Sequence, residues 1–228
     1  MSKNLDLYAK IEPYIGFYDE YDKLYDEYLK ILKEYDVLSI LDVGCGNGNM
    51  LKKLQDRGYR AEGIDLSQEM VSISQKKGVK ASCKDIADVE GRYDAVIAVA
   101  DVLNYIPKEF LKDFLKKVQE RLKKGGVFLC DINTKFGFSE VADGVMVKDE
   151  DDIFLSIDAL FDGETLDTHI TLFEKKGELY RRSDAYIEQY YHDIDDIVNS
   201  TAMKFEDSRG ISMFSDSSDK LLLGFINL

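Results

Sequence analysis

The hydrophobic and polar positions between residues 37 and 133 alternate between short apolar runs and amphipathic stretches. Apolar runs with many branched side chains are typical of strands that are buried on both faces. The predicted strands are Val37–Val43, Arg60–Ile64, Val79–Lys84, Tyr93–Val99 and Val127–Cys130. Apolar positions three or four residues apart predict the helices Asn49–Gln55, Ser67–Lys77 and Pro107–Lys123. Strands that alternate with helices in this way predict a parallel sheet and an α/β fold.

The pattern changes after Asp131, where three longer runs with strand character follow. They are separated by Asp162-Gly163 and Lys176-Gly177, which are typical turn sequences. These runs are Ile153–Leu160, Leu166–Phe173 and Leu179–Gln189, and they predict an antiparallel meander inserted as a cap on the α/β core. A short helix and a last strand are expected at Asp193–Ser200 and Leu221–Phe225. The acidic run Asp149–Asp152 is expected to be a solvated loop, because it lacks the spacing of a calcium loop.

The first 36 residues contain seven of the 14 tyrosines. Five of them follow one another in steps of 4, 3, 4 and 3, at Tyr14, Tyr18, Tyr21, Tyr25 and Tyr28. This spacing predicts one helix with a tyrosine stripe along one face. A tyrosine ring favours burial while its hydroxyl needs a polar partner. The stripe therefore packs on the core, or it also directs one or two hydroxyls into a ligand cleft.

The formal net charge is −14, from 30 Lys and Arg against 44 Asp and Glu. This charge repels nucleic acids and anionic membrane surfaces, so neither is expected as a partner. The sequence begins without the apolar core of a signal peptide and has no apolar run of about 20 residues, which predicts a cytoplasmic location. Cys45, Cys83 and Cys130 are expected to be reduced thiols, and their spacing predicts no metal site.

The most informative motif is the glycine-rich turn Leu41–Gly48, which follows an apolar strand and opens a helix. Open α/β sheets bind ligands at this position, beyond the carboxyl end of the first strand. The G-x-G-x-G spacing differs from the G-x-G-x-x-G of dinucleotide sites, and no Gly-Lys-Ser/Thr follows as in a phosphate loop. Asp42 precedes the glycines, and a carboxylate at this point suits a positively charged ligand.

Two more acidic residues stand at strand ends. Asp65 ends the second strand, where a carboxylate can accept hydrogen bonds from ribose hydroxyls. Asp85 follows the third strand, and its side chain together with the backbone of Ile86 can read the edge of adenine. With Asp42, these residues predict a site for a nucleoside that carries a cationic tail.

These motifs resemble those of the class I S-adenosylmethionine-dependent methyltransferases. Leu41–Gly48 resembles the first motif of that family, and Gly63–Met70 its second, acidic motif. Asp85-Ile86 resembles the adenine-reading motif, and Tyr93–Tyr105 and Leu122–Asn133 resemble the fourth and fifth strands with their flanks. The region after residue 133 is similar to the cap of bacterial small-molecule methyltransferases of the glycine and sarcosine type.

The resemblance implies a Rossmann-like, doubly wound, mostly parallel sheet of seven strands in the order 3-2-1-4-5-7-6, with an antiparallel β cap after strand 5. The last two strands are expected near Lys204–Glu206 and Lys220–Asn227. The chain then forms a single methyltransferase domain of four parts. These are a tyrosine-rich helical segment (1–36), a cofactor-binding core (37–133), the cap (134–192), and the last helix and strands (193–228).

The resemblance also implies that S-adenosylmethionine is the cofactor and S-adenosylhomocysteine the product. Carried over residue by residue, the methionine part would meet Asp42, Gly44, Cys45, Gly46 and Asn47. The ribose and adenine would meet Asp65, Leu66, Met70, Asp85 and Ile86. Ala100 would face the methyl end, and Tyr14 and Tyr18 would close over the cofactor.

A general base is needed only if the nucleophile arrives protonated. The candidates are Asp101, Tyr105 and His192, although a histidine before a predicted helix is also a common structural residue. Tyr191 is a candidate base or substrate contact. Arg181 and Arg182 stand in a predicted strand, so they face opposite sides, and one of them can pair with a carboxylate or phosphate in the cleft. An exposed cap strand explains the same arginines without any function.

The sequence thus predicts an enzyme that transfers a methyl group to N or O of a small molecule, working as a monomer or homodimer. Two alternatives remain open at this point. One is a protein methyltransferase with an acidic groove for a basic target. The other is a non-catalytic cofactor-binding protein or partner subunit, whose cleft would be filled by the tyrosine side chains.

Overall fold

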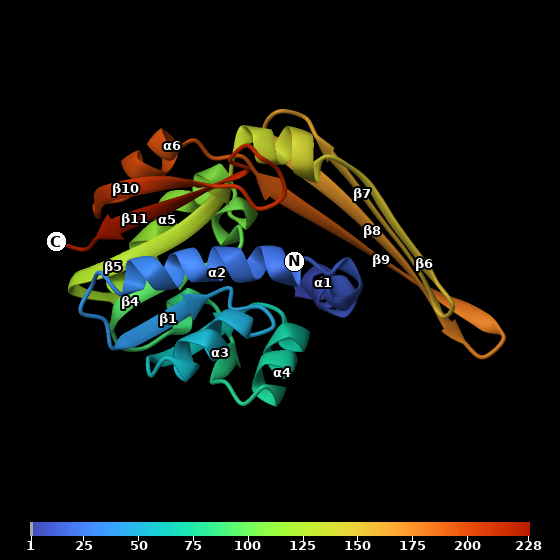
Figure 1. The fold of residues 1–228 in the computed structure, drawn as a ribbon, viewed down its shortest axis with the longest axis horizontal. Helices are drawn as coiled ribbons and strands as arrows, with labels where there is room; N and C mark the ends of the chain where they lie inside the picture. The colour runs from blue at the N-terminus through green and yellow to red at the C-terminus, as the bar shows by residue number, and fades with distance from the viewer. Residues whose placement is uncertain (1) are drawn as a thin grey trace.

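The computed structural model describes residues 2–228, which are built around a seven-stranded sheet (Figure 1). Its order is β3-β2-β1-β4-β5-β11-β10. The strands are β1 (Ser39–Val43), β2 (Arg60–Asp65), β3 (Ala81–Cys83), β4 (Tyr93–Ala98), β5 (Leu122–Asn133), β10 (Lys204–Ile211) and β11 (Lys220–Ile226). The first five are parallel, and β11 runs antiparallel to both β5 and β10. The predicted order, with β10 and β11 as sixth and seventh strands, is confirmed.

Helices cover both faces of this sheet, as a doubly wound fold requires. One face packs on α2 (Tyr18–Leu32), α3 (Asn49–Asp56) and α4 (Gln68–Lys76), and the other on α5 (Lys108–Glu120) and α6 (Ile194–Asn199). Successive residues of β4 alternate between the two clusters: Ile97 faces α2 and α3, and Val96 faces α5. This burial on both faces explains why the strands form continuous apolar runs.

The tyrosine-rich segment forms two helices, so the expectation of a single helix is wrong. They are α1 (Ser2–Ile15) and α2 (Tyr18–Leu32). Gly16 and Phe17 between them have φ angles of 81° and 62°, and two left-handed residues in succession break the helix. Tyr14 therefore faces the cap with α1, whereas Tyr28 is fully buried against the core on α2.

The cap is a four-stranded antiparallel sheet that extends away from the core as an arm (Figure 1). Its strands are β6 (Gly144–Glu150), β7 (Ile153–Phe161), β8 (Thr165–Lys176) and β9 (Leu179–Tyr190). Leu155, Ile170 and Ala185 form part of its inner face, which packs on Leu7 and Ile11 of α1.

The strand β6 was not predicted, and part of the acidic run expected to be a loop belongs to it: Asp149 pairs with Phe154 of β7. The residues of β6 are mostly exposed, so the strand lacks the apolar alternation that reveals a buried one. Three short helical turns complete the chain: η1 (Ile86–Asp88), η2 (Val102–Tyr105) and η3 (Gly137–Ala142).

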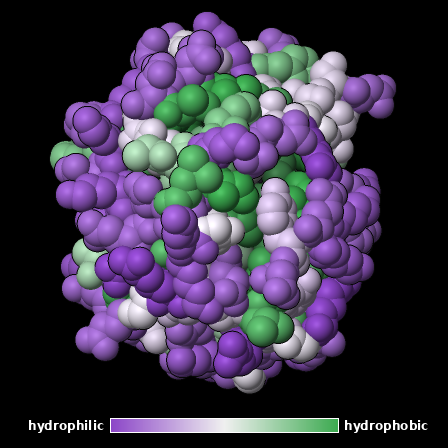
Figure 2. Space-filling model, turned by 90° about the vertical axis from the view of Figure 1, so that its left-hand side faces the viewer, coloured by the Kyte–Doolittle hydropathy of each residue, from purple (hydrophilic) through white to green (hydrophobic). Residues whose placement is uncertain are grey.

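The end of the molecule opposite the cap is largely hydrophilic, with hydrophobic side chains gathered in a narrow central band (Figure 2). Between residues 2 and 228, no helix is both long and apolar enough to cross a membrane.

Candidate active site

A cavity of about 370 Å³ lies between the core and the cap, at the carboxyl ends of β1, β2 and β4. This is the edge at which open α/β sheets bind ligands. The glycine-rich turn, η1 and η2 form the core side of the cavity, and α1, α2 and the inner face of the cap close it. Its size is typical of a small-molecule site.

The turn after β1 brings backbone atoms close to the cavity. Gly44 and Gly46 have φ angles of 71° and 50°, which favour glycine. A Cβ on Gly44 would lie 2.6 Å from Cγ2 of Val102, so a side chain does not fit there. A Cβ on Gly46 would meet no other protein atom within 4 Å, which leaves its backbone open toward a ligand. Cys45 and Asn47 line the cavity beside them.

Asp42 is the most unusual group in the cavity wall. Its side chain is 1% exposed, and neither carboxylate oxygen has a hydrogen-bond partner in the described part of the chain. Burial raises the pKa of Asp42 well above its usual range, and the negative charge of Asp65 raises it further. Buried carboxylates are normally paired, so an unpaired one beside a cavity indicates a ligand that donates hydrogen bonds or carries positive charge. The amino group of S-adenosylmethionine fits this requirement.

The second acidic residue, Asp65, is held in place by backbone donors. It accepts hydrogen bonds from the amides of Gly46 (2.9 Å) and Ser67 (2.8 Å). Burial raises the pKa of Asp65, while these hydrogen bonds act in the opposite direction. Each carboxylate oxygen can accept more than one hydrogen bond, so Asp65 can also bind hydroxyl groups of a ligand. Leu66 and Met70 line the cavity next to it.

The third acidic residue, Asp85, caps η1 and accepts a hydrogen bond of 2.8 Å from the amide of Ala87. Ile86 is 4% exposed and contributes apolar surface to the same part of the cavity. Asp42, Asp65 and Asp85 thus come from the ends of three neighbouring strands, as the sequence predicted, and all three line one cavity.

The loop after β4 forms another part of the wall. Ala100 and Asp101 have φ angles of 65° and 66°, and both line the cavity. The carboxylate of Asp101 forms an ion pair with Lys220. Tyr105 also lines the cavity, and burial strongly raises the pKa of its hydroxyl. The residues that the cap adds are Ile157, Thr168, Ile170, Ile187 and Gln189.

Helices α1 and α2 close the cavity, and Glu12 of α1 makes the polar contacts there. The sequence alone did not single out this residue. Glu12 accepts a hydrogen bond from Nδ2 of Asn47 (3.0 Å) and one from the hydroxyl of Tyr18 (3.4 Å). Burial raises the pKa of Glu12. Tyr18 lines the cavity as expected, together with Tyr8, Tyr21 and Tyr25. No local motif distinguishes Glu12 from a solvated acid on a helix, so only the fold reveals its position.

Three candidate residues, one on α1 and two on the cap strand β9, lie outside the cavity lining. Tyr14 packs in the cluster between α1 and the cap. Arg182 pairs with Asp184 of the same strand, with 2.7 Å between Nη2 and Oδ1. Arg181 is exposed on β9, toward the hairpin end of the strand.

The remaining two candidates, Tyr191 and His192, line a different hollow beside α6. The hydroxyl of Tyr191 donates to Asp193 (2.5 Å). His192 is 1% exposed, with Nε2 3.1 Å from the carbonyl oxygen of Leu103 and 2.9 Å from that of Ile106. These contacts hold η2 in place. His192 therefore has the structural role that the sequence analysis gave as the alternative to a catalytic one.

Comparison with known proteins agrees with this site. Residues 40–126 match the model of a family described as a methyltransferase domain. YqeM of Bacillus subtilis (strain 168), a protein named as a methyltransferase, is 32% identical over 162 residues, which are 66% of each chain. The chain thus matches just under two thirds of that relative's length. A crystal structure of an S-adenosylmethionine-dependent methyltransferase from Clostridium acetobutylicum ATCC 824 superposes with a TM-score of 0.76 and 26% identity, covering 90% of this chain and 91% of that one.

Residues 40–126 form a methyltransferase domain, and the chain as a whole is similar to class I S-adenosylmethionine-dependent methyltransferases. Its cofactor is S-adenosylmethionine. The sugar N-methyltransferase KedS8 from Streptoalloteichus sp ATCC 53650 shares the fold of this methyltransferase, including the cap, with a TM-score of 0.74 at 17% identity, covering 97% of this chain and 92% of that one.

Proposed function

We propose that this methyltransferase transfers a methyl group from S-adenosylmethionine to a nitrogen or oxygen atom of a small molecule. The observation that carries the proposal is the unpaired, buried carboxylate of Asp42 in the wall of a cavity that the cap closes. The net charge of −14 and the fold shared with a sugar N-methyltransferase support a small-molecule acceptor over a polyanion.

The residues of the core hold the cofactor in this proposal. Asp42 binds the amino group of the methionine part, and the backbone of Gly44, Gly46 and Asn47 surrounds that part. Asp65 holds the ribose, with Leu66 beside it. Met70, Asp85 and Ile86 hold the adenine. Ala100 and Asp101 then lie at the methyl end, and Glu12 with Tyr18 closes the cavity from α1 and α2.

The cofactor, when bound, supplies a methyl group that is already activated on a sulfonium. The protein mainly has to align the acceptor with that methyl group and to exclude water. Alignment of this kind can lower a barrier by about 7–11 kcal/mol. The inner face of the cap, with Ile157, Ile170 and Ile187, supplies the apolar wall that excludes water.

Transfer of a labelled methyl group tests the proposal. The protein is incubated with S-adenosylmethionine labelled in the methyl group and with a cell extract separated by size into small molecules and macromolecules. We expect label in the small-molecule fraction and none in the protein fraction. Label on protein would replace the proposal by the protein methyltransferase alternative. Binding of the cofactor without transfer to either fraction would indicate the non-catalytic alternative.

A further inference from the structure

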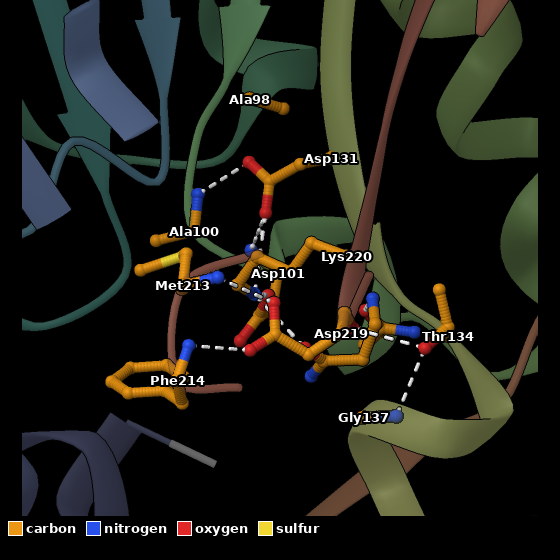
Figure 3. A network of polar contacts seen from close by, with 12 residues as sticks. Ala98, Ala100, Asp101, Asp131, Thr134, Gly137, Met213, Phe214, Asp219 and Lys220 are labelled. Atoms are coloured by element: carbon orange, nitrogen blue, oxygen red, sulfur yellow. Dashed lines mark hydrogen bonds and ion pairs between the residues drawn. The ribbon is translucent and has the colours of Figure 1, made fainter. Parts of the chain in front are cut away.

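Three charged side chains, one of which lines the cavity, meet at a buried point of the core (Figure 3). Lys220 begins β11, Asp131 lies on β5, and Asp101 follows β4. Their side chains are 3%, 0% and 17% exposed, respectively. Lys220 forms an ion pair with Asp101, and its Nζ lies 3.4 Å from Oδ2 of Asp131 and 2.9 Å from Oδ1 of Asn133. Asp101 is the member of this cluster that lines the cavity.

Asp219, the residue that precedes Lys220, holds the backbone in place through hydrogen bonds. The carboxylate of Asp219 accepts hydrogen bonds from the amides of Met213 (2.9 Å) and Phe214 (2.6 Å) (Figure 3). The carbonyl oxygen of Asp219 accepts a hydrogen bond from the amide of Thr134 (2.9 Å). A Cβ on Gly137 would lie 2.2 Å from the same carbonyl oxygen, so this contact requires glycine. Lys220 is therefore held at a fixed place relative to Asp101.

Asp131 is occupied by other partners. It accepts hydrogen bonds from the hydroxyl of Tyr28 (2.7 Å) and from the amides of Ala100 (2.7 Å) and Asp101 (3.1 Å). Asp101 has no such set: within residues 2–228, its carboxylate has Lys220 alone as a partner. Burial lowers the pKa of Lys220 and raises that of Asp131. The cluster contains one ammonium group for two carboxyl groups, which leaves Asp101 able to bind a second cation from the cavity.

The rest of the cavity lining also favours a cation. The rings of Tyr8, Tyr21 and Tyr105 line the cavity, and aromatic faces stabilise cations. Of the residues described, Lys84 is the one basic side chain in the cavity lining, and it precedes Asp85 at the proposed adenine end. An acceptor with a carboxylate or phosphate would thus have no basic partner there and would meet the negative charge of Asp101.

We propose that Asp101, positioned by Lys220, binds the ammonium group of an amine acceptor and takes its proton. This inference rests on the proposed function, because it names the acceptor of the same site. The N–H bond breaks and its electron pair stays on nitrogen as the lone pair of a neutral amine. The proton forms an O–H bond on Asp101, which returns it to solvent after the methylated amine has left. Asp101 is a catalytic residue in this scheme, and Lys220 is a positioning residue.

The test uses the full chain saturated with S-adenosylhomocysteine and three probes of the same shape: cyclohexylamine, cyclohexanol and cyclohexanecarboxylate. Binding of each is measured by calorimetric titration at neutral pH. We expect saturable binding of the amine, and at least about tenfold weaker binding of the alcohol and the carboxylate, because only the amine forms a charge-assisted hydrogen bond with Asp101. Equal binding of the carboxylate, or no saturable binding of cyclohexylamine, overturns the inference.

The variant Asp101→Asn keeps the shape of the side chain and removes its charge. We expect it to weaken amine binding about tenfold or more and to leave the affinity for S-adenosylhomocysteine within about twofold. Asp207→Asn, on an exposed part of β10, removes the same charge elsewhere and serves as the control. Unchanged amine affinity in Asp101→Asn overturns the inference. If the unaltered protein does not bind S-adenosylhomocysteine at all, the proposed function is overturned instead.

The positioning role of Lys220 is tested with two variants. Lys220→Met removes the ammonium group, and Lys220→Arg retains a positive charge. We expect Lys220→Met to weaken amine binding several-fold while S-adenosylhomocysteine binding persists, and Lys220→Arg to recover part of the loss. If neither variant alters amine binding, Lys220 does not position Asp101. If Lys220→Met does not fold, Asp101→Asn still tests whether Asp101 binds the amine. Lys220→Arg then tests whether Lys220 positions Asp101, because an altered amine affinity is expected if it does.

Discussion

The core and the cap line the same cavity with different chemistry. The core contributes charged groups that follow or end strands of the central sheet, among them Asp42, Asp65, Asp85 and Asp101. From the cap come three isoleucines, one threonine and one glutamine, and none of these side chains is charged. The core thus determines which charges a ligand can carry, and the cap determines which shapes can enter. Variants on the two sides should therefore separate cofactor binding from acceptor binding.

The largest effect on cofactor binding is expected from Gly44→Ala. The left-handed backbone costs about 1–2 kcal/mol for a residue with a Cβ, and the contact with Val102 adds about 1–3 kcal/mol. We expect lower stability in urea unfolding and loss of measurable S-adenosylhomocysteine binding. Gly58→Ala is the matched control, because Gly58 also has a positive φ (86°) but its Cβ would meet nothing within 4 Å. Normal cofactor binding by Gly44→Ala would show that the turn is not the binding site.

The next largest effect is expected from Asp42→Asn. Loss of a charge-assisted hydrogen bond of about 1.5–3 kcal/mol weakens S-adenosylhomocysteine binding by roughly ten- to more than a hundredfold. The ligand-free protein should become more stable at neutral pH, because the buried unpaired charge is removed. Calorimetric titration and urea unfolding measure the two effects. A variant that binds normally, or one that is less stable than the unaltered protein, would contradict the role of Asp42.

The pH dependence of stability follows from the direction of the Asp42 pKa shift. The pKa is raised in the folded protein, so the folded state binds this proton more tightly than the unfolded chain does. The contribution to stability is fully present below the unfolded pKa of about 3.9 and is lost as the pH rises through the folded value. We expect the stability difference between Asp42→Asn and the unaltered protein to grow with pH over this range. A difference that is independent of pH would show that Asp42 is not the group responsible.

On the cap side, Ile170→Ala should affect the acceptor and spare the cofactor. Ile170 is 1% exposed and packs against α1, so its truncation costs about 2–5 kcal/mol of stability. We expect S-adenosylhomocysteine affinity within about twofold of normal and weaker binding of an acceptor probe. A fall in cofactor affinity as large as that of Asp42→Asn would remove the distinction between the two sides of the cavity.

The smallest effect is expected from Arg182→Ala. Arg182 lies on the exposed face of the cap and pairs with Asp184, away from the cavity. We expect no measurable change in the binding of S-adenosylhomocysteine or of an amine probe in the same titrations. Weaker binding of the probe would mean that the acceptor reaches this face of the cap.

The difference between core and cap also explains what could be predicted from the sequence. In the core, the chemistry follows the ends of buried strands, so Asp42, Asp65 and Asp85 could be found from local motifs alone. The sheet order could be predicted because the motifs resemble a family whose fold is fixed. Most of the cap residues that line the cavity are ordinary apolar positions on strands, and nothing local separates them from the other buried residues on the inner face of the cap.

The errors have physical reasons of the same kind. The tyrosine spacing continues through Gly16 and Phe17, so periodicity alone concealed the break between α1 and α2. The mostly exposed β6 gave no signal of a buried strand. Lys220 could not be recognised, because its partners Asp101 and Asp131 lie on strands or loops that are far away in the sequence and meet only in the folded sheet.

The most direct test of the central claim is calorimetric titration of S-adenosylhomocysteine into the full chain, compared with Gly44→Ala and Gly58→Ala. The account predicts saturable binding of one molecule per chain by the unaltered protein and by Gly58→Ala, and none by Gly44→Ala. Absence of binding to the unaltered protein, or equal binding to all three, would contradict a cofactor site at the glycine-rich turn.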